Sequence, residues 1–233
     1  MGLDSVEILV KVEKTFGIDI PNLEAEKIAT VGDFHDAVWR HIANKQNTKC
    51  ASQLLFYRLR KAIVETFDYP KSQFHLDASV NDIFPKRDRR TTYLKFANDN
   101  KLKLPALVLP TAWSIFLTTI GITVIIGALI LPIILINFFG YSKLMMLMPV
   151  AAVALTYFIA FLLTSKRTVV EPATVRRFVQ QVMAINYASL NEGIGSNRKD
   201  VEVVINYIIA DMAGLDINEV TTEKSITNDL GID

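Results

Sequence analysis

The sequence contains few of the residues that form disulfides or metal centres. It has one cysteine, Cys50, and three histidines among 233 residues. A single cysteine excludes a disulfide within the chain and is typical of a reducing compartment. The histidines are scattered, so no metal-ligand cluster is visible and we expect no metal. No base–nucleophile pair and no phosphate-binding loop is visible either, so we expect that the chain is not an enzyme.

Charged residues are absent from two long stretches. None occurs between Lys103 and Lys143, and none between Lys143 and Lys166. About 20 uncharged apolar residues are enough to cross a bilayer as a helix. We therefore predict a transmembrane hairpin with spans near 112–138 and 144–164 and a short loop at 137–142. The alternative is a pair of buried helices in a soluble protein, but such helices rarely run this long without a charge.

The outer flanks of the two apolar runs are basic. Positive flanks remain on the cytoplasmic side of a membrane. We therefore expect a two-pass protein of the cytoplasmic membrane with both chain ends in the cytoplasm. The first apolar run begins about a hundred residues into the chain, which is not the pattern of a signal peptide. The flanking residues are Lys86, Arg87, Arg89, Arg90, Lys95, Lys101 and Lys103 before the first span, and Lys166, Arg167, Arg176 and Arg177 after the second.

The first 45 residues predict two helices joined by a short extended segment. Val6, Leu9, Val10 and the stretch from Val12 to Phe16 form an apolar stripe that Gly17 ends. The segment Ile18-Asp19-Ile20-Pro21 follows. Thr30 is placed to cap a second helix that carries Val31, Phe34, Val38 and Ile42 on one face. This order resembles the second half of an acyl carrier protein, and the match covers residues 2–43.

The last 35 residues predict the complementary half. Val204, Tyr207, Ile208 and Met212 form a helical stripe that ends at Gly214. A long loop follows, and the chain finishes with Asp229-Leu230-Gly231-Ile232-Asp233. In the carrier family this "DLGID" sequence immediately precedes the serine that carries the prosthetic group. Residues 199–233 and 1–45 therefore resemble one carrier domain in permuted order, closed either within one chain or between neighbouring chains.

The middle of the chain, residues 51–190, resembles a degenerate copy of the same module. The stretch 59–67 parallels 205–213, the stretch 73–77 parallels 219–223, and Asn81-Asp82-Ile83 parallels Asn228-Asp229-Leu230. Residues 102–105 parallel 18–21, and 174–182 parallel 30–38 beyond the apolar runs. The serine position falls at about Arg87, so this copy cannot carry phosphopantetheine. The alternative is that short helical stripes resemble one another by chance.

Charge separates the two modules. Residues 1–45 and 199–233 contain sixteen acidic and seven basic side chains, a net charge of −9, whereas residues 46–198 have a net charge of +10. An acidic module fits the carrier pattern, in which acidic residues steer the protein toward basic patches on partner enzymes. A basic module suits the surface of an anionic leaflet. Solvated charge without a partner is the alternative.

Ser5 is the candidate attachment point for 4′-phosphopantetheine. The stretch Gly2-Leu3-Asp4-Ser5 places a serine at a helix N-terminus, where the helix dipole favours a phosphodiester. In the family, however, the serine lies five residues before the glutamate of a "VEL" stretch. Val6-Glu7-Ile8 is that stretch here, so the family register points to Gly2. Three interpretations remain open: Ser5 is the attachment site, Ser5 is an ordinary N-terminal helix residue, or a partner chain supplies a half that bears the serine.

The resemblance implies an all-α fold of carrier-like bundles with a transmembrane hairpin, and a non-enzymatic role in fatty acid metabolism. The chain would hold or present acyl groups to lipid-processing enzymes at the membrane, and a phosphopantetheinyl transferase would be a further partner. The runner-up is an interaction or scaffold protein without prosthetic group, which self-associates through its split halves. We expect no nucleic acid partner, and a transporter ranks far below. Asp4, Glu7, Glu13, Asp229 and Asp233 are the candidate partner-binding residues, and Leu9, Val12, Phe16 and Ile208 the candidate core.

Overall fold

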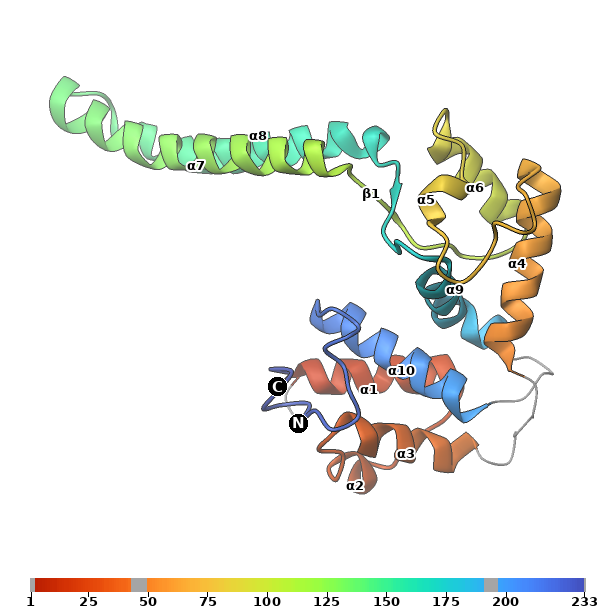
Figure 1. Ribbon diagram of the computed structural model, residues 1–233. Helices are drawn as coiled ribbons and strands as arrows, with labels where there is room; N and C mark the ends of the chain where they lie inside the picture. The colour runs from red at the N-terminus through yellow and green to blue at the C-terminus, as the bar shows by residue number, and fades with distance from the viewer. Residues whose placement is uncertain (1–2, 43–49, 191–196, 233) are drawn as a thin grey trace. The chain divides into compact units, whose positions relative to one another are not determined.

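The computed structural model describes residues 3–42, 50–190 and 197–232, and in this part of the chain the fold is all-α, as predicted (Figure 1). The only strands among the described residues are two pairs of residues. The chain divides into two compact units. One comprises 1–85, 93–105 and 172–233, and the other comprises 86–92 and 106–171.

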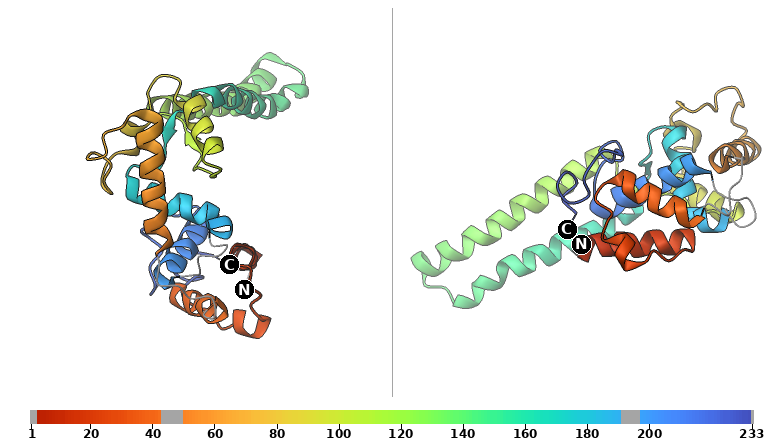
Figure 2. Two further views of the ribbon diagram at one scale, coloured as in Figure 1. Left: turned by 90° about the vertical axis from the view of Figure 1, so that its right-hand side faces the viewer. Right: turned by 90° about the horizontal axis from the view of Figure 1, so that it is seen from below.

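Helices from both ends of the chain pack together in the first unit. They are α1 (Leu3–Phe16), the short α2 (Asn22–Ala25), α3 (Val31–Ile42) and α10 (Arg198–Ala213). Helix α10 contacts both α1 and α3, and the three views show it beside α1 (Figures 1 and 2). The predicted core residues Leu9, Val12, Phe16 and Ile208 are all buried. The N- and C-terminal segments therefore share one apolar core within a single chain.

The predicted apolar stripes are wrong at three positions. Val6, Val10 and Met212 are between 38% and 41% exposed. In α1 the buried face consists of Ser5, Ile8, Leu9, Val12 and Phe16. A helix turns about 100° per residue, so this spacing places positions 6 and 10 on the flank of the stripe. The predicted face of α3, by contrast, is buried at all four positions.

A second group of helices comes from the middle of the chain. It contains α4 (Ala51–Phe67), α5 (Val80–Ile83), α6 (Arg89–Asp99) and α9 (Val175–Leu190). It lies in the same unit, except that the first residues of α6, 89–92, belong to the other unit. The ring of Phe84 makes edge contacts with Phe67, Tyr93, Phe96 and Phe178, at centroid distances of 4.9–6.2 Å. Such pairs add to the apolar burial that holds the helices together.

Both groups of helices repeat one set of backbone hydrogen bonds. In the first group, Val31 N–H donates to Lys224 O, Gly32 N–H to Thr222 O, and Ile226 N–H to Ala29 O. In the second group the equivalent bonds are Val175 N–H to Ala78 O, Arg176 N–H to Leu76 O, and Val80 N–H to Ala173 O. Isolated β-bridges join Thr30 to Ser225 and Ser79 to Thr174. In each group a loop crosses the start of one helix, α3 in the first group and α9 in the second. Carbonyls of the loop accept hydrogen bonds from N–H groups that have no partner inside that helix.

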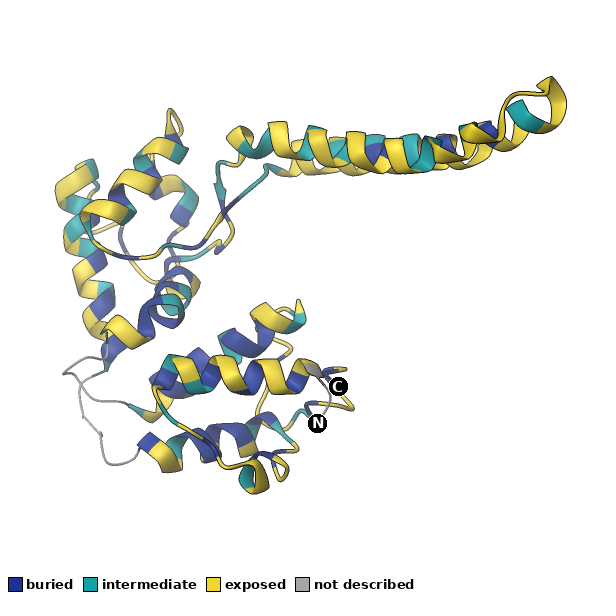
Figure 3. Cartoon of the chain, turned by 180° about the vertical axis from the view of Figure 1, so that it is seen from behind, coloured by how far each residue is buried: buried dark blue, intermediate teal, exposed yellow. Residues whose placement is uncertain are grey.

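The second unit is a helical hairpin. Strands β1 (Leu107–Val108) and β2 (Val169–Val170) pair antiparallel at its base. Helix α7 (Thr111–Phe139) runs beside α8 (Met148–Leu162), which is flanked by the 3₁₀ turns η2 (Lys143–Leu147) and η3 (Leu163–Lys166). The two helical stretches, 111–139 and 143–166, are long and apolar enough to cross a membrane. Most of their side chains are exposed, unlike those of a core helix in a soluble protein (Figure 3).

The loop predicted at 137–142 is wrong in its first three residues. Helix α7 continues to Phe139, and Gly140 then adopts a left-handed conformation with φ of 69°. Tyr141 N–H donates to Leu135 O, which closes the helix end. Inside the hairpin Gly121 allows close approach, because a Cβ at this position would lie 3.0 Å from Thr156 Cγ2.

The start of α3 is a reciprocal capping box, as the position of Thr30 predicted. Asp33 N–H donates to Thr30 Oγ1 at 3.1 Å, and Thr30 N–H donates to Asp33 Oδ2 at 2.9 Å. Hydrogen bonding to the Asp33 carboxylate by the Thr30 side chain, and secondly by the Thr30 N–H, lowers the pKa of the Asp33 carboxyl. At the equivalent position of α9, Arg177 N–H lies 3.5 Å from Thr174 Oγ1, and an arginine cannot accept the reciprocal bond.

We expect Thr30→Ala to lower the free energy of unfolding by about 1 kcal/mol, the usual effect of losing an N-cap. Thr174→Ala is the matched control, and it should cost less than half as much because its single hydrogen bond is long. Urea unfolding of the full chain in detergent, followed by circular dichroism, measures both. Equal losses in the two variants would contradict the assignment.

Candidate carrier site

The two segments that resemble the carrier attachment region lie at the same end of the first helical group. The start of α1 and the end of the described chain are close together in each view (Figures 1 and 2). Leu230 and Ile232 are buried, and Gly231 between them has a φ of 66°. Ile232 N–H donates to Ile226 O at 3.1 Å, which folds the chain end back onto the loop. The start of α1 and the terminal loop that meet at this end of the first helical group therefore come from the same chain.

Ser5 lies in the first turn of α1 with only 5% of its surface exposed. A phosphodiester on this hydroxyl would place a charged group among buried side chains, which is costly. The fold as it stands therefore does not fit phosphopantetheine at Ser5. The other register position, Gly2, lies outside the described residues.

The predicted partner-binding residues fall into different environments. Asp4 and Glu7 are exposed on α1, and Asp229 is exposed on the terminal loop. Glu13 is half-buried, and its Oε1 accepts the Ile20 N–H at 2.8 Å, so it holds the segment that leaves α1. The Asp229 carboxylate accepts the Ser225 N–H at 2.8 Å. Asp233 lies outside the described residues. The structure thus brings Asp4 and Asp229 to exposed positions in one helical group, while Glu13 has a structural contact.

The sequence position equivalent to Ser5 in the second helical group is an arginine. Ile18 N–H donates to Glu13 O after α1, and Leu102 N–H donates to Ala97 O after α6. Gly17 and Lys101 have positive φ at the matching point, which fixes an offset of 84 residues. Ser5 therefore corresponds to Arg89, while the family register position, Gly2, corresponds to Lys86, next to the predicted Arg87. The side chains of Ser5 and Arg89 are both buried in the first turn of their helices.

Sequence reasoning missed a set of buried polar side chains that join the helices. Asp200 in α10 accepts the Ala51 N–H at the start of α4 at 2.7 Å. Asn186 in α9 accepts the Lys103 N–H at 2.8 Å and donates to Lys103 O at 2.7 Å. All three bonds satisfy backbone groups of segments distant in sequence, so no local pattern announces them.

His35 in α3 is 3% exposed, and its Nε2 lies 2.7 Å from Asn206 Oδ1 in α10. Its Nδ1 is buried without a hydrogen-bond partner among the described residues. Burial lowers the pKa of His35, and Arg198 acts in the same direction, while the bond to Asn206 and the carboxylates of Glu202 and Asp36 oppose the shift. The neutral ring is therefore the form that suits this helix contact.

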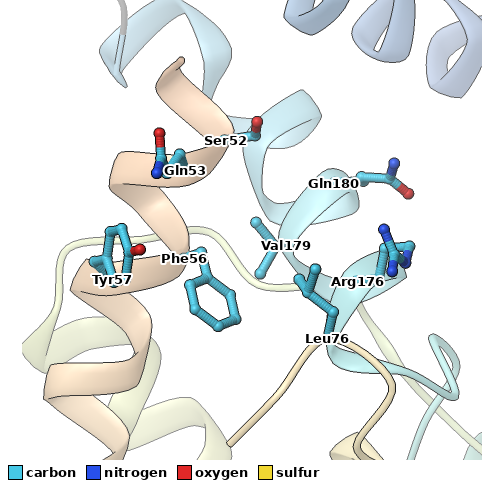
Figure 4. Close-up of a pocket in the computed structure, with 8 residues that line it drawn as sticks. All are labelled: Ser52, Gln53, Phe56, Tyr57, Leu76, Arg176, Val179 and Gln180. Carbon is cyan, nitrogen blue, oxygen red and sulfur yellow. The ribbon is translucent and has the colours of Figure 1, made fainter. Parts of the chain in front are cut away.

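A groove of about 360 Å³ lies on the second helical group, between α4 and α9 (Figure 4). Phe56, Leu76 and Val179 face it, with Arg176 at one edge. On the equivalent face of the first group, Arg198 pairs with Asp36 at 2.5 Å and with Glu202 at 2.9 Å. By the register of the repeated bonds, Ser52 and Gln180 occupy the positions of Arg198 and Asp36, so this ion pair has no counterpart at the groove.

Part of the chain is similar to acyl carrier proteins. The carrier protein of Thermosynechococcus vestitus is 46% identical over 42 residues, which cover 18% of this chain and 52% of that protein. That of Wolinella succinogenes is 61% identical over 32 residues, covering 14% and 42%. That of Rubrobacter xylanophilus is 49% identical over 40 residues, covering 17% and 49%.

The chain spans about half the length, or less, of these curated relatives. No family model matches the chain, and no solved structure matches it. The similarity therefore supports a segment that resembles an acyl carrier protein. Each match covers less than a fifth of the chain, so most of the chain lies outside this similarity.

The buried His35 predicts a pH dependence of stability. Its pKa is lower in the folded chain than the ordinary value of 6.5, so the unfolded chain binds more protons below that pH. The contribution of His35 is therefore present above the ordinary pKa of 6.5 and is lost progressively as the pH falls below it. His35→Gln should reduce the change in the thermal unfolding midpoint between pH 7.5 and pH 5. His75→Gln, at an exposed position, is the control and should keep the wild-type slope; an unchanged slope in His35→Gln would refute the assignment.

Proposed function

We propose that the chain is a membrane-anchored protein that presents an acyl-carrier-like module to acyl-handling enzymes at the cytoplasmic face. The observation that carries the proposal is the 46–61% identity to acyl carrier proteins over 32–42 residues. The exposed Asp4, Glu7 and Asp229 support a docking role, since acidic side chains steer a protein toward basic partner surfaces. The membrane hairpin would raise the local concentration of the module near lipid-processing partners.

A second function, docking by a carrier fold without a prosthetic group, is favoured by the burial of Ser5. The two functions share the same acidic surface and differ in one covalent modification. Scaffolding by exchange of halves between chains has less support, because both halves pack within one chain here.

Intact mass after co-expression with a broad-specificity phosphopantetheinyl transferase separates the two functions. Because the Ser5 hydroxyl is buried, we expect no added mass on the folded chain. An added phosphopantetheine that disappears in Ser5→Ala but persists in Ser52→Ala would show that the first turn of α1 opens and that the chain is a loaded carrier. Unmodified protein with unchanged helical content supports docking without a cofactor.

Membrane topology has an independent test that uses the scarcity of cysteine. In a Cys50→Ser background, Ser142→Cys places a thiol in the exposed turn between the two apolar helices, and Lys199→Cys places one at the exposed start of α10. In intact cells we expect an impermeant maleimide to label position 142 and to leave position 199 unlabelled. Permeabilised cells are the control, since both thiols should then react. Labelling of position 199 in intact cells would exclude a cytoplasmic carrier-like module.

A further inference from the structure

The base of the helical hairpin carries an excess of basic side chains. Within the second unit, residues 86–92 and 106–171 contain seven lysines and arginines and only two carboxylates, Asp88 and Glu171. Lys143 lies in the turn at the far end of the hairpin. Four of the others are exposed and form what we call the basic collar: Lys86, Arg87, Lys166 and Arg167.

Two further arginines bind backbone carbonyls in η3 and just after it, on either side of Lys166 and Arg167. Arg90 donates from its guanidinium to Thr164 O, and Arg89 donates to Thr168 O at 3.1 Å. Thr168 N–H donates in turn to Val108 O at 3.1 Å, next to the β1–β2 pair. The segment 86–90 therefore lies beside the last turn of the hairpin, and the residues before and after the apolar helices contribute charge to the same place.

The positive charges of the collar are not balanced by carboxylates among the described residues. No ion pair joins any of its four side chains to a carboxylate in the part of the chain that the structure describes. Arg176 and Arg177, by contrast, pair with Asp77 and Asp216. Four cations in one place repel one another, so an external anion would lower the electrostatic energy of the collar.

The collar lies where the apolar run of the hairpin ends, which is the level of the lipid headgroups in a membrane-spanning helix. The uncharged run of the second helical stretch ends at Ser165, immediately before Lys166. At the same end of the hairpin, Trp113 in the first turn of α7 is 40% exposed and contacts Phe116, and tryptophan is enriched at the headgroup level of membranes. Helix α7 has 29 residues, about 43 Å at 1.5 Å per residue, enough to reach from one headgroup layer to the other.

We propose that the basic collar is a binding site for the headgroups of anionic phospholipids. The proposal rests on membrane insertion of the hairpin, which belongs to the proposed function. Each lysine or arginine near an anionic leaflet strengthens binding severalfold.

The test is lipid retention by the full chain. The protein is reconstituted into vesicles of equal parts phosphatidylglycerol and phosphatidylcholine, extracted in mild detergent, and the retained lipids are quantified by headgroup. We expect phosphatidylglycerol to be enriched about fivefold or more over phosphatidylcholine. The variant with Lys86, Arg87, Lys166 and Arg167 all changed to Gln should lose this enrichment.

The matched control changes Lys11, Lys14, Lys27 and Lys199 to Gln, which removes the same charge from exposed positions of the first helical group. It should retain phosphatidylglycerol like the wild type. Retention in the vesicle ratio, equal loss in both variants, or displacement by millimolar inorganic phosphate would overturn the headgroup site. If alkaline carbonate releases the chain from the vesicles, the membrane anchoring itself fails, which is a separate result.

Discussion

The fold depends on a loop near the C-terminus, residues 222–226, that hydrogen-bonds to the first turn of α3. The N–H groups of Val31 and Gly32 have no partners inside α3, and they are satisfied by the carbonyls of Lys224 and Thr222. These residues are about 190 positions apart in the sequence, so the two ends of the chain must meet before α3 is complete. The Ile226 N–H to Ala29 bond closes the same crossing from the other side. Packing of α10 against α1 and α3 then buries the apolar faces of all three helices.

The same crossing in the second helical group shows how the fold tolerates a long insertion. There the carbonyls of Ala78 and Leu76 receive the N–H groups of Val175 and Arg176, and the helical hairpin lies between the two partners in sequence. A loop-closure cost grows only slowly with loop length. An insertion at a point where the chain ends are already held together by backbone bonds and by the β1–β2 pair is therefore compatible with the fold.

Much of the fold can be predicted from local sequence, and the limits have physical causes. Gly214 as a left-handed helix end and Thr30 as a helix cap act within a few residues, and each is found where the sequence placed it. Val6 and Val10 have the composition of core residues but lie on the flank of α1, because burial depends on where α10 packs. Asp200 and Asn186 bind backbone groups far away in sequence, and nothing around them in the chain indicates those partners.

The candidate site illustrates the harder case. The stretch from Gly2 to Ser5 matches a carrier motif in residue type, but chemistry at a hydroxyl depends on its exposure, and exposure is set by packing. Ser5 falls on the same face as Leu9 and Val12, so the helix period that makes α1 amphipathic also buries the serine. In the second group the same geometry buries Arg89, whose guanidinium reaches Thr168 instead of solvent. One backbone position thus supports a short hydroxyl in one copy and a long cation in the other. The sequence neighbours of the two positions differ in charge as well, since Asp4 and Glu7 lie beside Ser5, whereas Arg87 and Arg90 lie beside Arg89.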